Sequence, residues 1–223
     1  MATIIMRGGS KVVALVSGGV DSLALTAWAR ASGRVVPVYV RCGLAWEPAE
    51  LRAVRRWLAA LGSARVQALQ VMDLPLRSWY GAHWSVRGRG VPSATSADAA
   101  VYLPGRNLLL ASAAAICAVR QKASAIAFGT LAANPFDDAT PAFFTSLGRC
   151  LSRAFSRPLR ILAPLRRMTK AQVMARYPAL PYALTMSCLQ PRGDRHCGRC
   201  NKCAERRRAF RAARVPDPTI YMR

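Results

Sequence analysis

The stretch Ser17-Gly-Gly-Val-Asp-Ser22 follows the apolar run Val12–Val16 and precedes Leu23–Arg30, whose composition favours a helix. This order predicts a strand, a tight turn and a helix. The two glycines allow the backbone of the turn to curl so that its N–H groups point into one concavity, and the helix start behind it adds partial positive charge. The stretch therefore predicts an anion site, most simply for a phosphate.

The side chains of this stretch indicate what kind of anion site it is. Ser17 and Ser22 offer neutral donors, whereas Asp21 cannot face a phosphate unaided and so indicates either a Mg²⁺ ion or a helix cap. The lysine and the longer spacing of a Walker A loop are missing. The stretch resembles the S-G-G-x-D-S signature of the PP-loop ATP pyrophosphatases, which split ATP between its α and β phosphates. That resemblance implies that the ATP-binding residues are Ser17, Gly18, Gly19, Val20, Asp21 and Ser22.

Length and charge restrict the class of protein. A chain of 223 residues can form one sizeable α/β core with a small appendage. Its formal net charge of +23 suits polyanionic partners or phosphorylated substrates. Because nearly all the basic residues are arginines, coding bias also explains the charge, so a nucleic-acid partner is compatible with the composition but not required.

No membrane segment or signal peptide is expected. The longest apolar helical stretch, residues 108–119, is shorter than the roughly 20 residues that a bilayer requires. The first apolar run leads directly into the phosphate loop, which is unlike a leader sequence. We therefore expect a cytoplasmic protein without a membrane partner.

Hydrophobic patterns predict strands and helices in alternation. This order is typical of a doubly wound parallel sheet of five strands, with residues 72–105 as a long aperiodic loop. We expect one domain over residues 1–180 and an appendage over 181–223. Beyond the first strand and helix, strands are expected at 34–40, 65–71, 124–129 and 160–163, and helices at 48–61, 108–119, 141–155 and from 170.

Four cysteines near the C-terminus have the spacing of metal ligands. Cys188, Cys197, Cys200 and Cys203 read C-x8-C-x2-C-x2-C, and four thiolates suit a tetrahedral Zn²⁺ ion. With every position filled by protein, such a site would be structural. An iron–sulfur cluster is the alternative, because similar spacings serve both.

Taken together, the motifs resemble those of the 7-cyano-7-deazaguanine synthase family. They are the phosphate loop, Pro104-Gly-Arg-Asn107, Thr169-Lys-Ala171, the four cysteines and Asp217-Pro-Thr-Ile-Tyr221, in the family's order. The resemblance implies a Rossmann-like PP-loop domain with a zinc-binding appendage, and a homodimer. It also implies an ATP-dependent ligase that converts 7-carboxy-7-deazaguanine and ammonia to the nitrile through an adenylated acid and an amide, releasing AMP and pyrophosphate.

This chemistry assigns roles to several charged residues. Asp21, Arg106 and Lys170 are the candidate catalytic residues, the last two as counter-charges for phosphate or carboxylate. Arg106 is also a candidate for substrate binding, together with Asp137 and Asp138, whose carboxylates could accept from a guanine-like N1–H and amine. Two segments depart from the family pattern, residues 42–46 and 134–138.

Two other functions fit the same residues. One is a PP-loop adenylating enzyme that acts on tRNA or another macromolecule, with Cys42 as the sulfur carrier in a thiolation. The other is a zinc-containing nucleic-acid-binding protein with a vestigial ATP site. The complete Ser17–Ser22 signature argues against the second.

Overall fold

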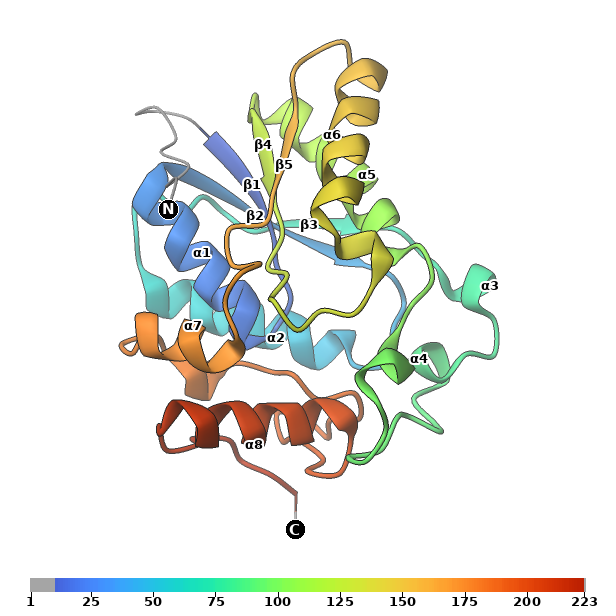
Figure 1. The fold of residues 1–223 in the computed structure, drawn as a ribbon, viewed down its shortest axis with the longest axis vertical. Helices are drawn as coiled ribbons and strands as arrows, with labels where there is room; N and C mark the ends of the chain where they lie inside the picture. The colour runs from blue at the N-terminus through green and yellow to red at the C-terminus, as the bar shows by residue number, and fades with distance from the viewer. Residues whose placement is uncertain (1–10, 223) are drawn as a thin grey trace.

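The computed structural model describes residues 11–222 as helices packed around one parallel sheet (Figure 1). The five strands stand in the order β3-β2-β1-β4-β5, and all neighbours are parallel. This confirms the expected α/β fold and its five-stranded parallel sheet. The strands are β1 (Lys11–Leu15), β2 (Arg34–Arg41), β3 (Gln70–Asp73), β4 (Ala125–Ala127) and β5 (Arg160–Leu162).

Helices cover both faces of this sheet. In Figure 1, α1 and α2 lie on one side of the strands and α5 and α6 on the other, while α7 and α8 lie near the carboxyl ends. The longer helices are α1 (Val20–Ser32), α2 (Glu47–Leu61), α5 (Arg106–Arg120), α6 (Pro141–Ala154), α7 (Lys170–Arg176) and α8 (Asn201–Ala213).

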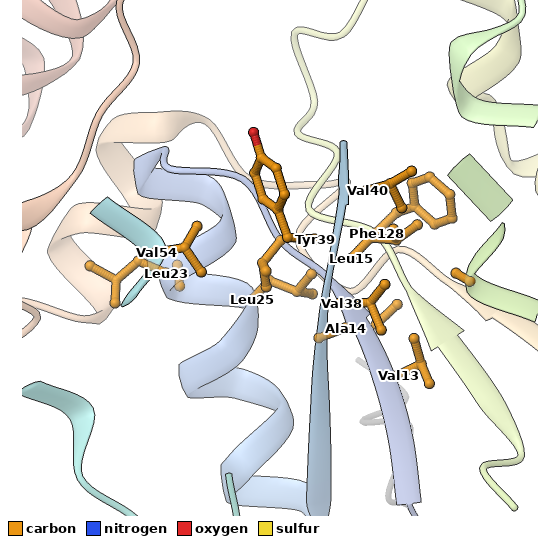
Figure 2. Packing of buried hydrophobic residues seen from close by; sticks show 14 of the residues in the cluster. Val13, Ala14, Leu15, Leu23, Leu25, Val38, Tyr39, Val40, Val54 and Phe128 are labelled. Atoms are coloured by element: carbon orange, nitrogen blue, oxygen red, sulfur yellow. The ribbon is translucent and has the colours of Figure 1, made fainter. Parts of the chain in front are cut away.

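The core lies where β1 and β2 meet α1. Val13 and Leu15 of β1 and Val38 of β2 are buried, together with Leu23 and Leu25 of α1 (Figure 2). A strand that is buried on both faces requires a continuous apolar run rather than an alternating one, which is why these strands could be located from sequence. The core thus fixes the carboxyl end of β1, from which the phosphate loop extends.

The third strand is shifted from its expected position. Val66 forms only an isolated bridge to Val35, and regular pairing begins at Gln70, opposite Val38. β3 is an edge strand with alternating burial, so its apolar signal is weak. The strand expected at residues 65–71 therefore lies at 70–73.

The segment expected to be one long loop contains short helical turns. They are α3 (Arg77–Tyr80), α4 (Trp84–Arg87) and the 3₁₀ turn Asp98–Val101. Each has only four residues, too few for a helical period to be visible in sequence. None of the helices within residues 11–222 is both long and apolar enough to cross a bilayer.

Candidate active site and metal centre

The phosphate loop has the geometry of an anion cradle. The Ser17 N–H donates to Ser22 Oγ (2.8 Å), and the two serine hydroxyls lie 3.0 Å apart. Helix α1 begins directly after Gly19, and no side chain of the described residues caps it. Its first N–H groups are therefore available to a ligand, as the sequence predicts.

Gly18 is required because other backbone segments approach it closely. A Cβ atom built there would lie 2.9 Å from the α-carbon of Glu50 and 2.9 Å from the Met186 carbonyl oxygen. The Met186 N–H also donates to the Gly18 carbonyl (2.7 Å). Helix α2 and the segment before the cysteines therefore hold the phosphate loop from two sides.

A chain of alternating charges lies beside the loop. Lys170 Nζ is 3.2 Å from Asp21 Oδ2 and 2.6 Å from Glu205 Oε1, and Lys202 Nζ is 2.7 Å from Glu205 Oε2. Burial raises the pKa of the Glu205 carboxyl, but the two lysines outweigh burial and lower it to about 2. Burial likewise lowers the pKa of Lys170, and Asp21 and Glu205 reverse this so that its pKa is raised. Lys170 and Glu205 are therefore both ionised near neutral pH.

The loop and this chain of charges open into one cavity of about 600 Å³. Its walls come from the carboxyl ends of the strands and from α2, α5, α7 and α8. Polar and charged lining residues are Ser17, Asp21, Ser22, Tyr39, Glu50, Asp98, Arg106, Asn107, Thr130, Asn134, Thr169, Lys170, Lys202, Glu205 and Arg208. This volume is within the range of small-molecule sites.

Three buried polar atoms in the cavity wall lack a hydrogen-bond partner within residues 11–222. They are Asp21 Oδ1, Arg106 Nε and Thr130 Oγ1. Buried polar groups in proteins are nearly always satisfied, so atoms that remain unpaired around one cavity indicate a ligand that pairs with them. A carboxylate oxygen without a donor also fits a divalent cation such as Mg²⁺.

The structure brings some predicted residues together and leaves others apart. Arg106 and Lys170 both line the cavity, as the predicted phosphate-loop residues Ser17, Asp21 and Ser22 do. Asp137 and Asp138 are not among its lining residues. The Asp138 carboxylate instead accepts from the backbone N–H (3.2 Å) and the side-chain amide (3.0 Å) of Asn107, at the start of α5. The substrate role of these two aspartates remains a prediction.

Sequence reasoning missed several cavity residues, most notably Glu50 and Glu205. Glu50 lies on the same stripe of α2 as Val54 and Leu61, and all three are buried. A carboxylate on an apolar stripe is a signal that could have identified it. Glu205 offered no such signal, because its helix is highly charged and reaches the cavity only through tertiary packing.

Cys42 is not among the residues that line the cavity. Its side chain is fully buried, and the thiol donates to the Val40 carbonyl (3.7 Å). Burial raises the pKa of this thiol to about 11, which disfavours the reactive thiolate. This environment is that of a core residue rather than a sulfur carrier.

The four C-terminal cysteines converge as predicted. Their sulfur atoms lie within 4.8 Å of one another and all four residues are buried. Backbone N–H groups point at the sulfurs, for example Cys197 N–H at Cys188 Sγ (3.1 Å) and Leu189 N–H at Cys200 Sγ (3.5 Å). The donor set fits a thiolate-bound metal such as zinc, and also an iron–sulfur cluster.

The cysteine centre is joined to the phosphate loop by residues 185–187, which we call the strap. Its Met186 pairs with Gly18 as described, and the Ser187 N–H donates to His196 Nε2 (3.1 Å). Arg206 of α8, 1% exposed, donates to the hydroxyls of Thr185 (2.7 Å) and Ser187 (3.3 Å). His196 is thus a structural acceptor beside the cysteine cluster.

Comparison with known proteins identifies the family. The family described as "Queuosine biosynthesis protein QueC" matches residues 11–214. The chain belongs to this family. The relationship confirms the resemblance found in the sequence motifs.

Relatives align with the chain over nearly its whole length. A 7-cyano-7-deazaguanine synthase from Anaeromyxobacter sp. is 34% identical and covers 97% of this chain and 98% of its own. The protein of the same name from Cupriavidus necator is also 34% identical, over 95% of this chain and 97% of its own. Because these relatives are synthases, the family supports an enzymatic role for the chain.

A solved structure shows the same fold in another enzyme. The U34-tRNA thiolase NcsA from Methanococcus maripaludis, determined with its [4Fe-4S] cluster, superposes with a TM-score of 0.52. The match covers 83% of this chain and 61% of the thiolase at 13% identity. At this identity the likeness concerns the fold alone.

Proposed function

We propose that the protein is an ATP-dependent ligase that converts 7-carboxy-7-deazaguanine and ammonia to 7-cyano-7-deazaguanine, releasing AMP and pyrophosphate. The observation that carries the proposal is the cavity lined by the Ser17–Ser22 loop and by unpaired polar atoms of Asp21, Arg106 and Thr130. The names of the relatives supply the substrate class. The protein would act in the cytoplasm as a homodimer.

The reaction activates a poor electrophile in each of two steps, first the substrate carboxylate and then the amide. The substrate carboxylate attacks the α-phosphate of ATP, and pyrophosphate leaves into the phosphate loop. Ammonia then displaces AMP to form the amide, whose oxygen is adenylated by a second ATP before the nitrile forms. The protein acts by positioning the reactants and stabilising charge, since no covalent protein intermediate is required.

Residues of the cavity have separate tasks in this scheme. The loop N–H groups and serine hydroxyls hold the leaving pyrophosphate, and Lys170 and Arg106 balance phosphate and carboxylate charge. Asp21 Oδ1 would hold Mg²⁺, which when bound neutralises phosphate charge. The four cysteines would hold Zn²⁺, which stabilises the C-terminal appendage.

The test is product analysis with purified protein, ATP, Mg²⁺, ammonium and 7-carboxy-7-deazaguanine. We expect mass spectrometry to detect first the amide and then the nitrile, with two AMP released per nitrile. Absence of both products would contradict the proposal, and AMP release on addition of tRNA instead would identify a macromolecular acceptor.

A further inference from the structure

Glu50 is the cavity carboxylate that has no ion-pair partner within 4 Å among the described residues. Asp21 and Glu205 both pair with Lys170, whereas Glu50 Oε2 accepts from the neutral Tyr39 hydroxyl (3.1 Å). Tyr39 is anchored in the core, and its hydroxyl points away from the apolar cluster (Figure 2). A strand and a helix therefore fix the position of this carboxylate.

Glu50 also lies against the phosphate loop. Its backbone packs directly against Gly18 of the phosphate loop, and its side chain lines the same cavity as Ser17 and Arg106. Only 9% of the residue is exposed. A buried carboxylate next to a phosphate site repels an anionic ligand, so its presence there calls for a positively charged or proton-donating reactant.

The proposed reaction supplies such a reactant. Nitrogen enters as ammonium with four protons and leaves as a nitrile with none, so the cavity must accept protons. Neither histidine of the chain, His83 or His196, lines it. Lys170 and Lys202 are paired with carboxylates, and Asp98 at the exposed rim accepts from Asn201 (3.1 Å).

We propose, on the basis of the function proposed above, that Glu50 binds ammonium in the cavity and acts as the general base that converts it to ammonia. The Glu50 carboxylate takes one proton from ammonium. The nitrogen lone pair then forms the C–N bond to the acyl carbon, and the C–O bond to AMP breaks with its electron pair leaving on AMP. The second proton passes to the departing phosphate, and Glu50 returns its proton to solvent through the cavity mouth.

The surroundings of Glu50 suit a base that works near neutral pH. Burial raises the pKa of its carboxyl from 4.5 to about 7, opposed by the charge of Arg106 on α5 and by the hydrogen bond from Tyr39 on β2. Glu47 on the same helix raises the pKa further, and Trp46 lowers it. A base is most effective when its pKa is close to the working pH.

The test separates acid activation from the ammonium step in Glu50→Gln, which keeps the shape of the side chain and an acceptor for Tyr39. ATP–pyrophosphate exchange dependent on 7-carboxy-7-deazaguanine needs no nitrogen base, so we expect it to remain within about threefold of wild type. We expect amide formation at saturating ammonium to fall by about 10²- to 10⁴-fold. The rise of wild-type kcat through pH 7 should disappear in the variant.

Glu47→Gln is the matched control on the same helix. The Glu47 carboxylate accepts from the backbone N–H groups of Cys42 (2.5 Å) and Gly43 (2.9 Å) and does not line the cavity. Its loss should change the ratio of amide formation to exchange far less than Glu50→Gln does, because it removes only the influence of Glu47 on the pKa of Glu50. Glu50→Asp, which restores a carboxylate, should recover part of the ammonium step.

The outcomes are distinguishable. Amide formation at the wild-type rate in Glu50→Gln, or an equal loss of exchange and amide formation, would overturn the role as base. Absence of acid-dependent exchange in the wild-type protein would instead overturn the proposed function, and this inference with it.

Discussion

At the scale of single residues, Lys170 is the cation that links two acidic side chains of the cavity wall. Its ammonium group lies between two carboxylates from different elements, Asp21 of α1 and Glu205 of α8. An ion placed in this way stabilises little by itself, because burying it costs desolvation energy. Removing it, however, leaves half-buried Asp21 without an ion-pair partner among the described residues and leaves Glu205 with only the more exposed Lys202.

We therefore expect Lys170→Met to lower the free energy of unfolding by about 3 kcal/mol, the lower end of values for a broken buried pair. Urea denaturation at pH 7 measures this loss. The control is Lys202→Met, because Lys202 also pairs with Glu205 but is more exposed and should cost less than about 1 kcal/mol. Equal effects of the two substitutions would contradict the central role of Lys170.

Glu50 makes stability depend on pH in the opposite direction to most carboxyls. Its folded-state pKa of about 7 is above the ordinary 4.5, so it contributes stability below pH 4.5 that is lost as pH rises through 7. The difference corresponds to on the order of 3 kcal/mol, an upper value for a group that remains open to the cavity. A catalytic carboxyl held in this way lowers stability at the pH where it works.

The expected result is that Glu50→Gln is more stable than wild type at pH 8, and that the two proteins differ little at pH 5. Urea unfolding curves at the two pH values measure this. A wild-type loss of stability between pH 5 and 8 that persists unchanged in the variant would assign the pH dependence to another group.

At the scale of elements, the strap over residues 185–187 connects the two parts of the site. The carbonyl oxygen of Met186 packs against Gly18, and the N–H of Met186 donates to the Gly18 carbonyl. Arg206 of α8 donates to the hydroxyl of Thr185 in the strap. Backbone packing of this kind leaves no space for a side chain. Gly18, the first glycine of the signature, is therefore required because there is no space for a side chain, and not only because the loop must be flexible.

Two neighbouring glycines provide a direct test of this packing. In Gly18→Ala the new methyl group would lie 2.9 Å from the backbone at Glu50 and Met186, so we expect a loss of about 1–3 kcal/mol in urea unfolding. In Gly19→Ala the nearest atom lies 3.6 Å away and the backbone φ of −80° suits alanine. Comparable destabilisation in both variants would argue against the tight packing at Gly18.

The sequence allowed the buried elements to be predicted and left the contacts between distant elements undetermined. Strands β1 and β2 and the start of α1 carry continuous apolar runs and a glycine signature, so their place and the anion site followed from local pattern. The edge strand β3 was misplaced because its burial alternates. Glu205 reaches the cavity from a helix near the other end of the chain, a proximity that no local pattern encodes.

At the scale of the whole molecule, the cysteine cluster and the phosphate loop form one connected structure. The cysteines fix the segment that carries the strap, and the strap pairs with the phosphate loop. Helix α8 begins directly after Cys200 and supplies Glu205 to the cavity. Loss of the metal should therefore affect more than local stability, because it should loosen the cradle for pyrophosphate.

We expect purified protein to contain one zinc ion per chain, and Cys197→Ser to lose it together with most pyrophosphate binding. Metal analysis and calorimetric titration with pyrophosphate measure the two effects. Cys150→Ser is the control, since Cys150 is exposed and outside the cluster. A brown, iron-containing preparation would show that the cysteines hold an iron–sulfur cluster instead of zinc. Full pyrophosphate binding by protein without metal would contradict the proposed connection between the cysteine cluster and the phosphate loop.

The pairing of Met186 with Gly18 also has a consequence for biosynthesis. These residues are far apart in the sequence, so the phosphate loop is supported by Met186 only when the cysteine region has also been synthesised. Chains fold from the N-terminus as they are made, and contacts of long sequence separation form slowly. A nascent chain that ends before the strap would therefore carry the phosphate-loop signature without a finished anion site, which would form only after the cysteine region has been made.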